Sequence, residues 1–121
     1  MPKDTTYSDE EIRQRLADEL PEWYLEDGWI RRKYKTAGWK ATLMVVNTVG
    51  HIAEAGWHHP DLTVSFAFVI VKLSTHSAKG VTDKDFALAR EIERVVMWRP
   101  EPGGALEGTP DDARFKYVKY G

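Results

Sequence analysis

Hydrophobic side chains recur at helical spacing in three stretches of the chain. Ile12, Leu16 and Leu20 are four residues apart and follow Ser8-Asp9-Glu10-Glu11, which fits a capping box, so we expect a helix that stops near Pro21. A second helix is predicted over 37–57 and a third after Thr82, which can cap it. Their apolar stripes are Trp39, Leu43, Val46, Val49 or Gly50, and Ala53 in the second, and Phe86, Ala89, Ile92, and Val95 or Val96 in the third.

Other segments alternate between apolar and polar positions, as strands do. Residues 23–26 and 29–35 flank Asp27-Gly28, a dipeptide suited to a tight hairpin turn. Residues 62–73 are apolar on both faces, which predicts a central strand with helices on one side and a second subunit on the other. Residues 115–120 predict a last strand. The element order predicts an α+β two-layer sandwich, with about three helices packed on one face of a four-stranded, mainly antiparallel sheet.

Length and composition narrow the classes of protein to consider. The chain has 121 residues, about one domain's length, and 42% of them are hydrophobic, enough to form a core. It has no cysteine, which excludes disulfides, thiolate metal sites and a cysteine nucleophile. The formal net charge of -2 argues against nucleic acid or membrane partners and favours a small ligand. The acidic first twenty residues do not resemble a signal peptide, so we expect a cytoplasmic protein.

Three of the four histidines fall where predicted elements end. His58 and His59 follow the long helix, and His76 follows the predicted central strand. Histidine suits proton transfer near neutral pH, and Glu54, one helical turn before His58, is placed to hold that imidazole. Structural interpretations stay open for each: a His-His-Pro helix stop, a histidine in an ordinary turn, and, for Asp85, a helix capping box.

Other kinds of site have weaker support in the sequence. A metal site lacks the HExxH spacing, and adjacent histidines chelate one ion poorly. No Gly-x-Ser-x-Gly elbow supports a serine nucleophile, and the glycines lack the spacing of a phosphate loop. Aromatic and basic residues alternate over 29–34 and 115–120, as they do in some nucleic acid sites, but half-buried strands give the same pattern.

Together these residues resemble the signature of a known family. Glu54-x-x-x-His58-His59-Pro60, the aromatic Phe66, Thr75-His76, Gly80 and Asp85 stand at the spacing found in the pterin-4a-carbinolamine dehydratases, with a resemblance over roughly 23–96. The resemblance implies a single domain of helices on one face of a four-stranded antiparallel sheet, assembled as a homodimer or homotetramer. Residues 97–121 extend beyond that core.

The resemblance also implies a reaction, the loss of water from a 4a-hydroxytetrahydropterin to give quinonoid dihydropterin. The family needs no metal and no organic cofactor for this step. By its pattern, His58 and His76 are the acid/base pair, His59 binds or orients the pterin, Glu54 braces His58, and Asp85 supports the site near His76. The predicted substrate contacts also include Pro60, Phe66 and Trp23, the last with a core role as the alternative.

The sequence departs from the family pattern in the loop after the motif proline. Leu62 stands where many members have tryptophan, Val64 where they have asparagine, and Phe66 replaces tyrosine. Two alternatives to a tetrahydrobiopterin dehydratase therefore stay open. One is a non-catalytic binding or assembly protein on the same fold, and the other is a dehydratase that acts on a different pterin, as in molybdopterin metabolism.

Overall fold

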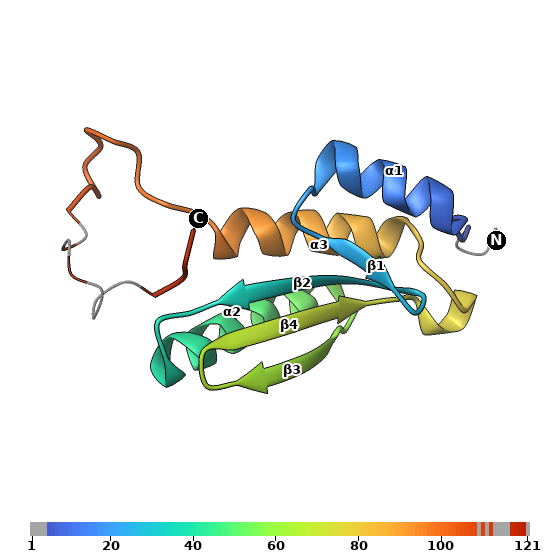
Figure 1. The fold of residues 1–121 in the computed structure, drawn as a ribbon, viewed down its shortest axis with the longest axis horizontal. Coiled ribbons are helices and arrows are strands. Elements are labelled where there is room, and N and C mark those ends of the chain that lie inside the picture. The colour runs from blue at the N-terminus through green and yellow to red at the C-terminus, as the bar shows by residue number, and fades with distance from the viewer. Residues whose placement is uncertain (1–4, 109, 111, 113–116, 121) are drawn as a thin grey trace.

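The computed structural model describes residues 5–108, 110, 112 and 117–120, and its elements follow the predicted order closely (Figure 1). Three helices and one four-stranded antiparallel sheet form an α+β fold. The elements are α1 (Asp9–Glu19), β1 (Tyr24–Glu26), β2 (Trp29–Lys35), α2 (Trp39–Gly56), β3 (Asp61–Ser65), β4 (Phe68–Leu73), a short 3-10 turn (His76–Ala78) and α3 (Asp83–Val96). Among the described residues, no helix is long and apolar enough to cross a membrane.

The predicted local signals start and stop these elements. Ser8 caps α1 in a complete capping box with Glu11, and Thr82 caps α3 in another with Asp85. The β1–β2 turn places Asp27 at φ 51° and Gly28 at φ 80°. Because glycine adopts such left-handed angles without steric cost, the Asp-Gly dipeptide fixes this turn.

The sheet has the strand order β1-β2-β4-β3, with every pairing antiparallel. One face is buried under α2 and α3, and α1 packs beside β1 and α3, as Figure 1 shows. Alternate residues of the two central strands fill the core, namely Ile30 and Tyr34 from β2 and Val69, Val71 and Leu73 from β4. The other face carries Trp29, Lys33 and Lys72, and none of the helices among the described residues lies over it.

The prediction of one long strand over 62–73 was wrong. Those residues form a hairpin, β3 and β4, with the turn at Phe66 and Ala67. Both turn residues are apolar and continue the alternation, so the pattern gave no sign of a break. Contacts from elsewhere hold the turn: Thr36 donates its N–H to the Ala67 carbonyl, and the Thr42 hydroxyl donates to the Phe66 carbonyl.

The predicted last strand and the predicted helix stripe also need correction. In the C-terminal segment Val118 forms an isolated bridge with Thr36 and is buried, while residues 115 and 116 lie outside the described residues. Thus β3, not the C-terminus, supplies the fourth strand. On α2 the buried stripe runs through Val45, Val49 and Ala53, and Trp39 and Leu43, predicted to be core residues, are exposed.

The topology brings two distant parts of the sequence to one end of the sheet. Asp61 pairs with Lys72, so the start of β3 lies beside the end of β4. The loop that follows α2 leads directly into β3, and the segment that follows β4 leads through the 3-10 turn into α3. Residues 57–60 and 74–82 therefore lie at the same end of the sheet, which sequence reasoning left undecided.

Candidate active site

The end of α2 fixes the backbone of the paired histidines. Trp57 caps the helix in a left-handed conformation, with φ 49° and ψ 45°, and the N–H of His58 donates to the Ala53 carbonyl at 3.1 Å. Pro60 then prevents the helix from continuing. The turn sends the two imidazoles in different directions, so each has its own carboxylate partner.

His58 is held by a fully buried carboxylate from the first turn of α3. Its Nε2 lies 2.6 Å from Asp85 Oδ1, and the His58 side chain is 16% exposed while that of Asp85 is 0% exposed. The prediction put Asp85 near His76 and let Glu54 brace His58. In the structure Asp85 bonds to Thr75, the neighbour of His76, and it is also the partner of His58 in place of Glu54.

The second oxygen of Asp85 is occupied by donors from the loop after β4. Asp85 Oδ2 accepts from the Thr75 hydroxyl at 2.7 Å and from the Thr82 N–H at 2.9 Å. The two hydroxyls are themselves 2.8 Å apart, and both threonines are buried. Asp85 is therefore both the helix-capping residue that the sequence suggested and the partner of His58, because each role uses a different oxygen.

His59 lies on the surface, with a different partner. Its Nε2 is 2.8 Å from Glu54 Oε1, and its ring makes an edge contact with Trp57 at a centroid distance of 5.0 Å. The prediction that Glu54 braces His58 was therefore wrong. The backbone turn at Trp57 directs the first imidazole inward toward α3, and the second reaches back along the exposed side of α2.

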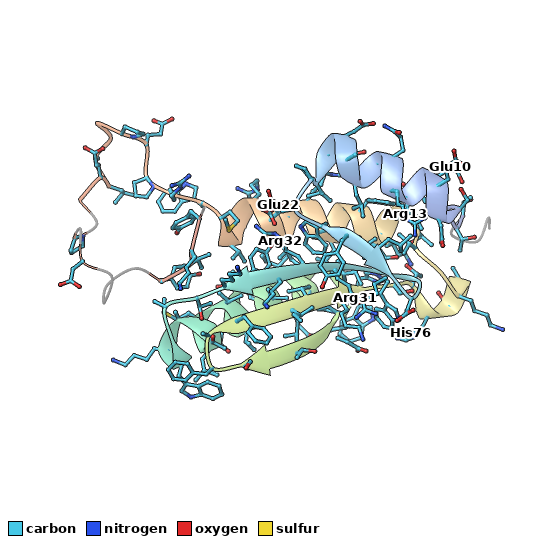
Figure 2. The ribbon with its side chains drawn as sticks, viewed as in Figure 1. Glu10, Arg13, Glu22, Arg31, Arg32 and His76 are labelled. Atoms are coloured by element: carbon cyan, nitrogen blue, oxygen red, sulfur yellow. The ribbon has the colours of Figure 1, made fainter. Side chains whose placement is uncertain are left out.

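His76 is exposed at the same end of the sheet, where Figure 2 shows it in the region of Arg31. Its ring meets the edge of Trp29 at a centroid distance of 5.6 Å. The Lys72 ammonium lies 4.9 Å from the centre of the same indole. His76 thus faces the side of the sheet that no described helix covers, while its neighbour Thr75 faces Asp85.

The structure separates two predicted contact residues from this cluster within one chain. Phe66 is 67% exposed in the β3–β4 turn, at the opposite end of the hairpin from the histidines, and lies near Gly38. Trp23 is a core residue whose indole N–H donates to Glu93 at 3.0 Å. Glu93 is eight residues beyond Asp85 on α3, about 12 Å along the helix axis. Pro60 is half-buried, in the loop beside His59.

A groove between α2 and α3 reaches the cluster at His58. Its volume is about 750 Å³, and its lining includes the apolar residues Ile52, Ala55 and Leu88 and the charged residues Lys84 and Glu91. His59 and His76 do not line it. Among the described residues, no three His, Cys, Asp or Glu side chains are placed to share a metal ion. The chemistry available here is proton transfer by imidazole, with one imidazole oriented by a buried carboxylate.

Sequence reasoning missed the parts of this arrangement that depend on tertiary contacts. The hydroxyls of Thr75 and Thr82 complete the support of Asp85, and the ring of Trp29 contacts His76. Thr82 was identified only as a helix cap, and Trp29 only as a strand residue. The alternation of β2 was the available signal for Trp29, because it puts this residue on the face opposite to Ile30.

Comparison with known proteins supports one family. The model of the family described as "Pterin 4 alpha carbinolamine dehydratase" matches residues 5–95. An Aquifex aeolicus protein named "Putative pterin-4-alpha-carbinolamine dehydratase" is 45% identical over 89 residues, which cover 74% of this chain and 89% of the relative. A Chloroflexus aurantiacus protein of the same name is 40% identical over 89 residues, covering 74% and 95%. A Brucella melitensis crystal structure, described as a "transcriptional coactivator/pterin dehydratase", matches with a TM-score of 0.69 at 26% identity, covering 76% of this chain and 99% of that one.

Proposed function

The chain belongs to the pterin-4a-carbinolamine dehydratase family, and we propose that it is an active hydro-lyase that dehydrates a 4a-hydroxytetrahydropterin to the quinonoid dihydropterin. We place the reaction in pterin cofactor recycling, in the cytoplasm, by a homodimer or homotetramer. An elimination of water requires an acid and a base, and His58, held by Asp85, and His76, beside Trp29, lie at the same end of the sheet.

The reaction needs an acid and a base, and both are available as imidazoles. The departing 4a-hydroxyl must receive a proton while a ring N–H gives one up, so that the electron pair of the N–H bond forms the new C=N bond. We assign this exchange to His58 and His76, with His59 binding or orienting the pterin. Proton transfer by a positioned side chain typically contributes on the order of 10² to 10⁴ in rate.

The observation that carries the proposal is the 2.6 Å contact between His58 and the fully buried Asp85. A helix stop needs no such partner, since the Trp57 conformation and Pro60 already end α2. A buried carboxylate that orients an imidazole at the rim of a groove is the arrangement found where histidine transfers protons. The bond therefore favours a catalytic over a purely structural histidine.

A non-catalytic role as a binding or assembly protein is the second candidate. The observation that favours it is the coactivator half of the description given to the Brucella melitensis structure. One fold can host both functions, so the fold does not decide between them. A dehydratase for another pterin, as in molybdopterin metabolism, is a variant of the first candidate, because the same histidines serve it.

Stopped-flow absorbance with chemically generated 4a-hydroxytetrahydropterin tests the proposal. We expect the folded protein to accelerate dehydration above the rate in buffer. A folded protein that leaves the buffer rate unchanged favours the binding or assembly role instead. Repeating the assay with pterins that differ in the C6 side chain identifies the preferred substrate.

A further inference from the structure

The hydrogen bonds around Asp85 fix where each hydroxyl proton points. The Thr75 hydroxyl donates to Asp85 Oδ2, so its single proton is not available to Thr82. The contact of 2.8 Å between the two hydroxyls must then be donated by Thr82. The Thr82 oxygen in turn accepts from the Lys84 N–H at 3.2 Å. This chain of donors therefore runs in one direction and ends on the carboxylate.

The donor in the contact between Asp85 and His58 can be identified in the same way. Asp85 Oδ2 already accepts two bonds, from Thr75 and from the Thr82 N–H. An ionised carboxylate can only accept, and the N-terminus of a helix favours negative charge. The bond at Oδ1 must then be donated by the imidazole, so Nε2 carries the proton and Nδ1 carries the lone pair.

We propose that His58 acts as the base of the dehydration through Nδ1, and that Asp85, Thr75 and Thr82 are positioning residues that hold it in the Nε2–H tautomer. This inference rests on the proposed function. In the reaction Nδ1 takes the proton of the ring N5–H, whose electron pair forms the C4a=N5 bond. The C4a–O bond breaks, and its electron pair leaves on oxygen, which receives a proton and departs as water.

The opposite placement of the proton fits the same distance between His58 Nε2 and Asp85 Oδ1. A protonated Asp85 that donates to Nε2 would put the ring proton of His58 on Nδ1. Such an imidazole presents a donor to the substrate, and in its neutral form it cannot accept the N5 proton there. The two arrangements thus assign opposite roles to Nδ1.

Nitrogen NMR on the ¹⁵N-histidine-labelled full chain distinguishes the two arrangements without any activity assay. Resonances of His58 are assigned by their loss in His58→Gln. Spectra are recorded about two units above the ordinary histidine pKa of about 6.5, where a free imidazole is neutral. We expect Nε2 in the shielded range of protonated ring nitrogens and Nδ1 in the deshielded range. The reverse assignment overturns the inference.

Asp85→Asn gives a sharper test because the structure predicts its orientation. The amide oxygen must face Thr75 and the Thr82 N–H, both of which donate, so the amide NH₂ faces His58. That NH₂ can only donate, which forces the imidazole proton onto Nδ1. We expect the nitrogen shifts of His58 to exchange and kcat to fall about a thousandfold, with KM changed less than about threefold; a wrongly fixed tautomer in a serine protease triad costs about 10⁴ in rate.

Thr75→Val removes one donor at nearly constant volume, and we expect kcat to fall about tenfold. Thr75→Ser restores the hydroxyl and should recover most of this loss, which a purely steric effect would not show. Asp83→Asn is the matched control in the same helical turn, because Asp83 faces Tyr7 and Arg15. It should leave the tautomer and kcat unchanged. Wild-type kcat in folded Asp85→Asn overturns the inference.

The NMR and kinetic results separate this inference from the proposed function. An active protein whose His58 carries its proton on Nδ1 overturns the inference alone. A protein with Nε2 protonated that does not accelerate dehydration overturns the proposed function, and with it the catalytic use of Nδ1. An active protein with Nε2 protonated, and with the exchange of shifts in Asp85→Asn, supports both.

Discussion

Replacing Glu93 by glutamine should lower the stability of the fold in a pH-dependent way. Glu93 on α3 accepts from three side chains that join β2 and the residue before β1 to this helix. The Tyr34 hydroxyl donates at 2.7 Å, Arg32 Nε at 2.9 Å and the Trp23 indole N–H at 3.0 Å. Tyr34 and Trp23 are only 1% and 3% exposed, so neither donor can turn to water.

The magnitude follows from the change in these three bonds, which all end on Glu93 Oε1, and in a fourth bond from Arg32 Nη2 to Glu93 Oε2 at 3.2 Å. A hydrogen bond to a charged acceptor contributes about 1.5–3 kcal/mol and a neutral one about 0.5–1.5 kcal/mol. Glu93→Gln keeps the shape but removes the charge, which weakens each of the three bonds to Oε1 by roughly 1 kcal/mol. Its amide NH₂ takes the place of Oε2 and cannot accept from Arg32 Nη2, so the fourth bond is lost. The four changes sum to roughly 4 kcal/mol, and because the Glu93 side chain is 23% exposed, we expect a loss below that sum, about 3 kcal/mol at pH 7.

The pKa of Glu93 determines how its contribution to the free energy of unfolding changes with pH. Burial alone raises the pKa of Glu93, but the bonds from Arg32 and Tyr34 outweigh it and hold that pKa below its usual value. Burial and the adjacent carboxylate raise the pKa of Tyr34, so its hydroxyl stays a donor. The stabilisation from Glu93 is therefore complete above the unfolded-state pKa of about 4.3, and is lost as the pH falls through the lower folded-state pKa.

Urea unfolding from pH 7 to pH 3, at matched protein concentration, measures both effects. We expect the wild-type protein to lose more free energy of unfolding on acidification than Glu93→Gln, so the difference between them narrows. Glu91→Gln is the control, because Glu91 pairs with Arg94 on the surface, where water screens the charges, and its loss should leave the free energy of unfolding nearly unchanged. Parallel pH curves for wild type and Glu93→Gln would show that the charge of Glu93 adds no stability.

Three further predictions concern the site and the C-terminal extension. Glu54→Gln should raise KM about threefold in the stopped-flow assay and leave kcat nearly unchanged, because Glu54 supports His59 and not His58. Trp29→Ala should lower kcat about tenfold in the same assay, since it removes the ring against which His76 packs. Val118→Ala should lower the free energy of urea unfolding by about 2 kcal/mol, because it removes two carbons from a buried position and leaves a cavity.

Controls and contrary outcomes accompany these three variants. Trp98→Ala removes an exposed tryptophan outside the site and should leave kcat unchanged. If Glu54→Gln instead slows turnover by about a hundredfold or more, Glu54 acts on the reacting histidine. Equal kcat for Trp29→Ala and wild type would remove the role given to that ring. A change below about 0.5 kcal/mol for Val118→Ala would show that the C-terminal segment adds little to the core.

The sequence was sufficient for features that local interactions determine. Capping boxes at Ser8 and Thr82, the Asp27-Gly28 turn and the stop at Pro60 each act within a few residues, and each prediction was confirmed. The hairpin turn at 66–67 was not predictable in this way. Its residues are apolar, and the bonds that hold it come from Thr36 and Thr42, which lie 24 residues or more earlier in the chain.

The partners of the candidate site residues also depend on contacts between distant parts of the chain. Spacing alone made Glu54 the natural partner of His58, since one helical turn separates them. The structure gives that role to Asp85, 27 residues later, because the N-terminus of α3 packs against the C-terminus of α2. The packing of these two helix ends depends on the whole core. The spacing of residues close in the sequence therefore does not predict it.

Catalysis of dehydration by His58 and His76 is tested most directly by the stopped-flow rate with 4a-hydroxytetrahydropterin for wild type, His58→Ala and His76→Ala. We predict that wild type accelerates the reaction and that each variant, shown to be folded by circular dichroism, is slower by a factor on the order of 10² or more. Folded variants that dehydrate the substrate at the wild-type rate would show that these histidines do not carry the reaction.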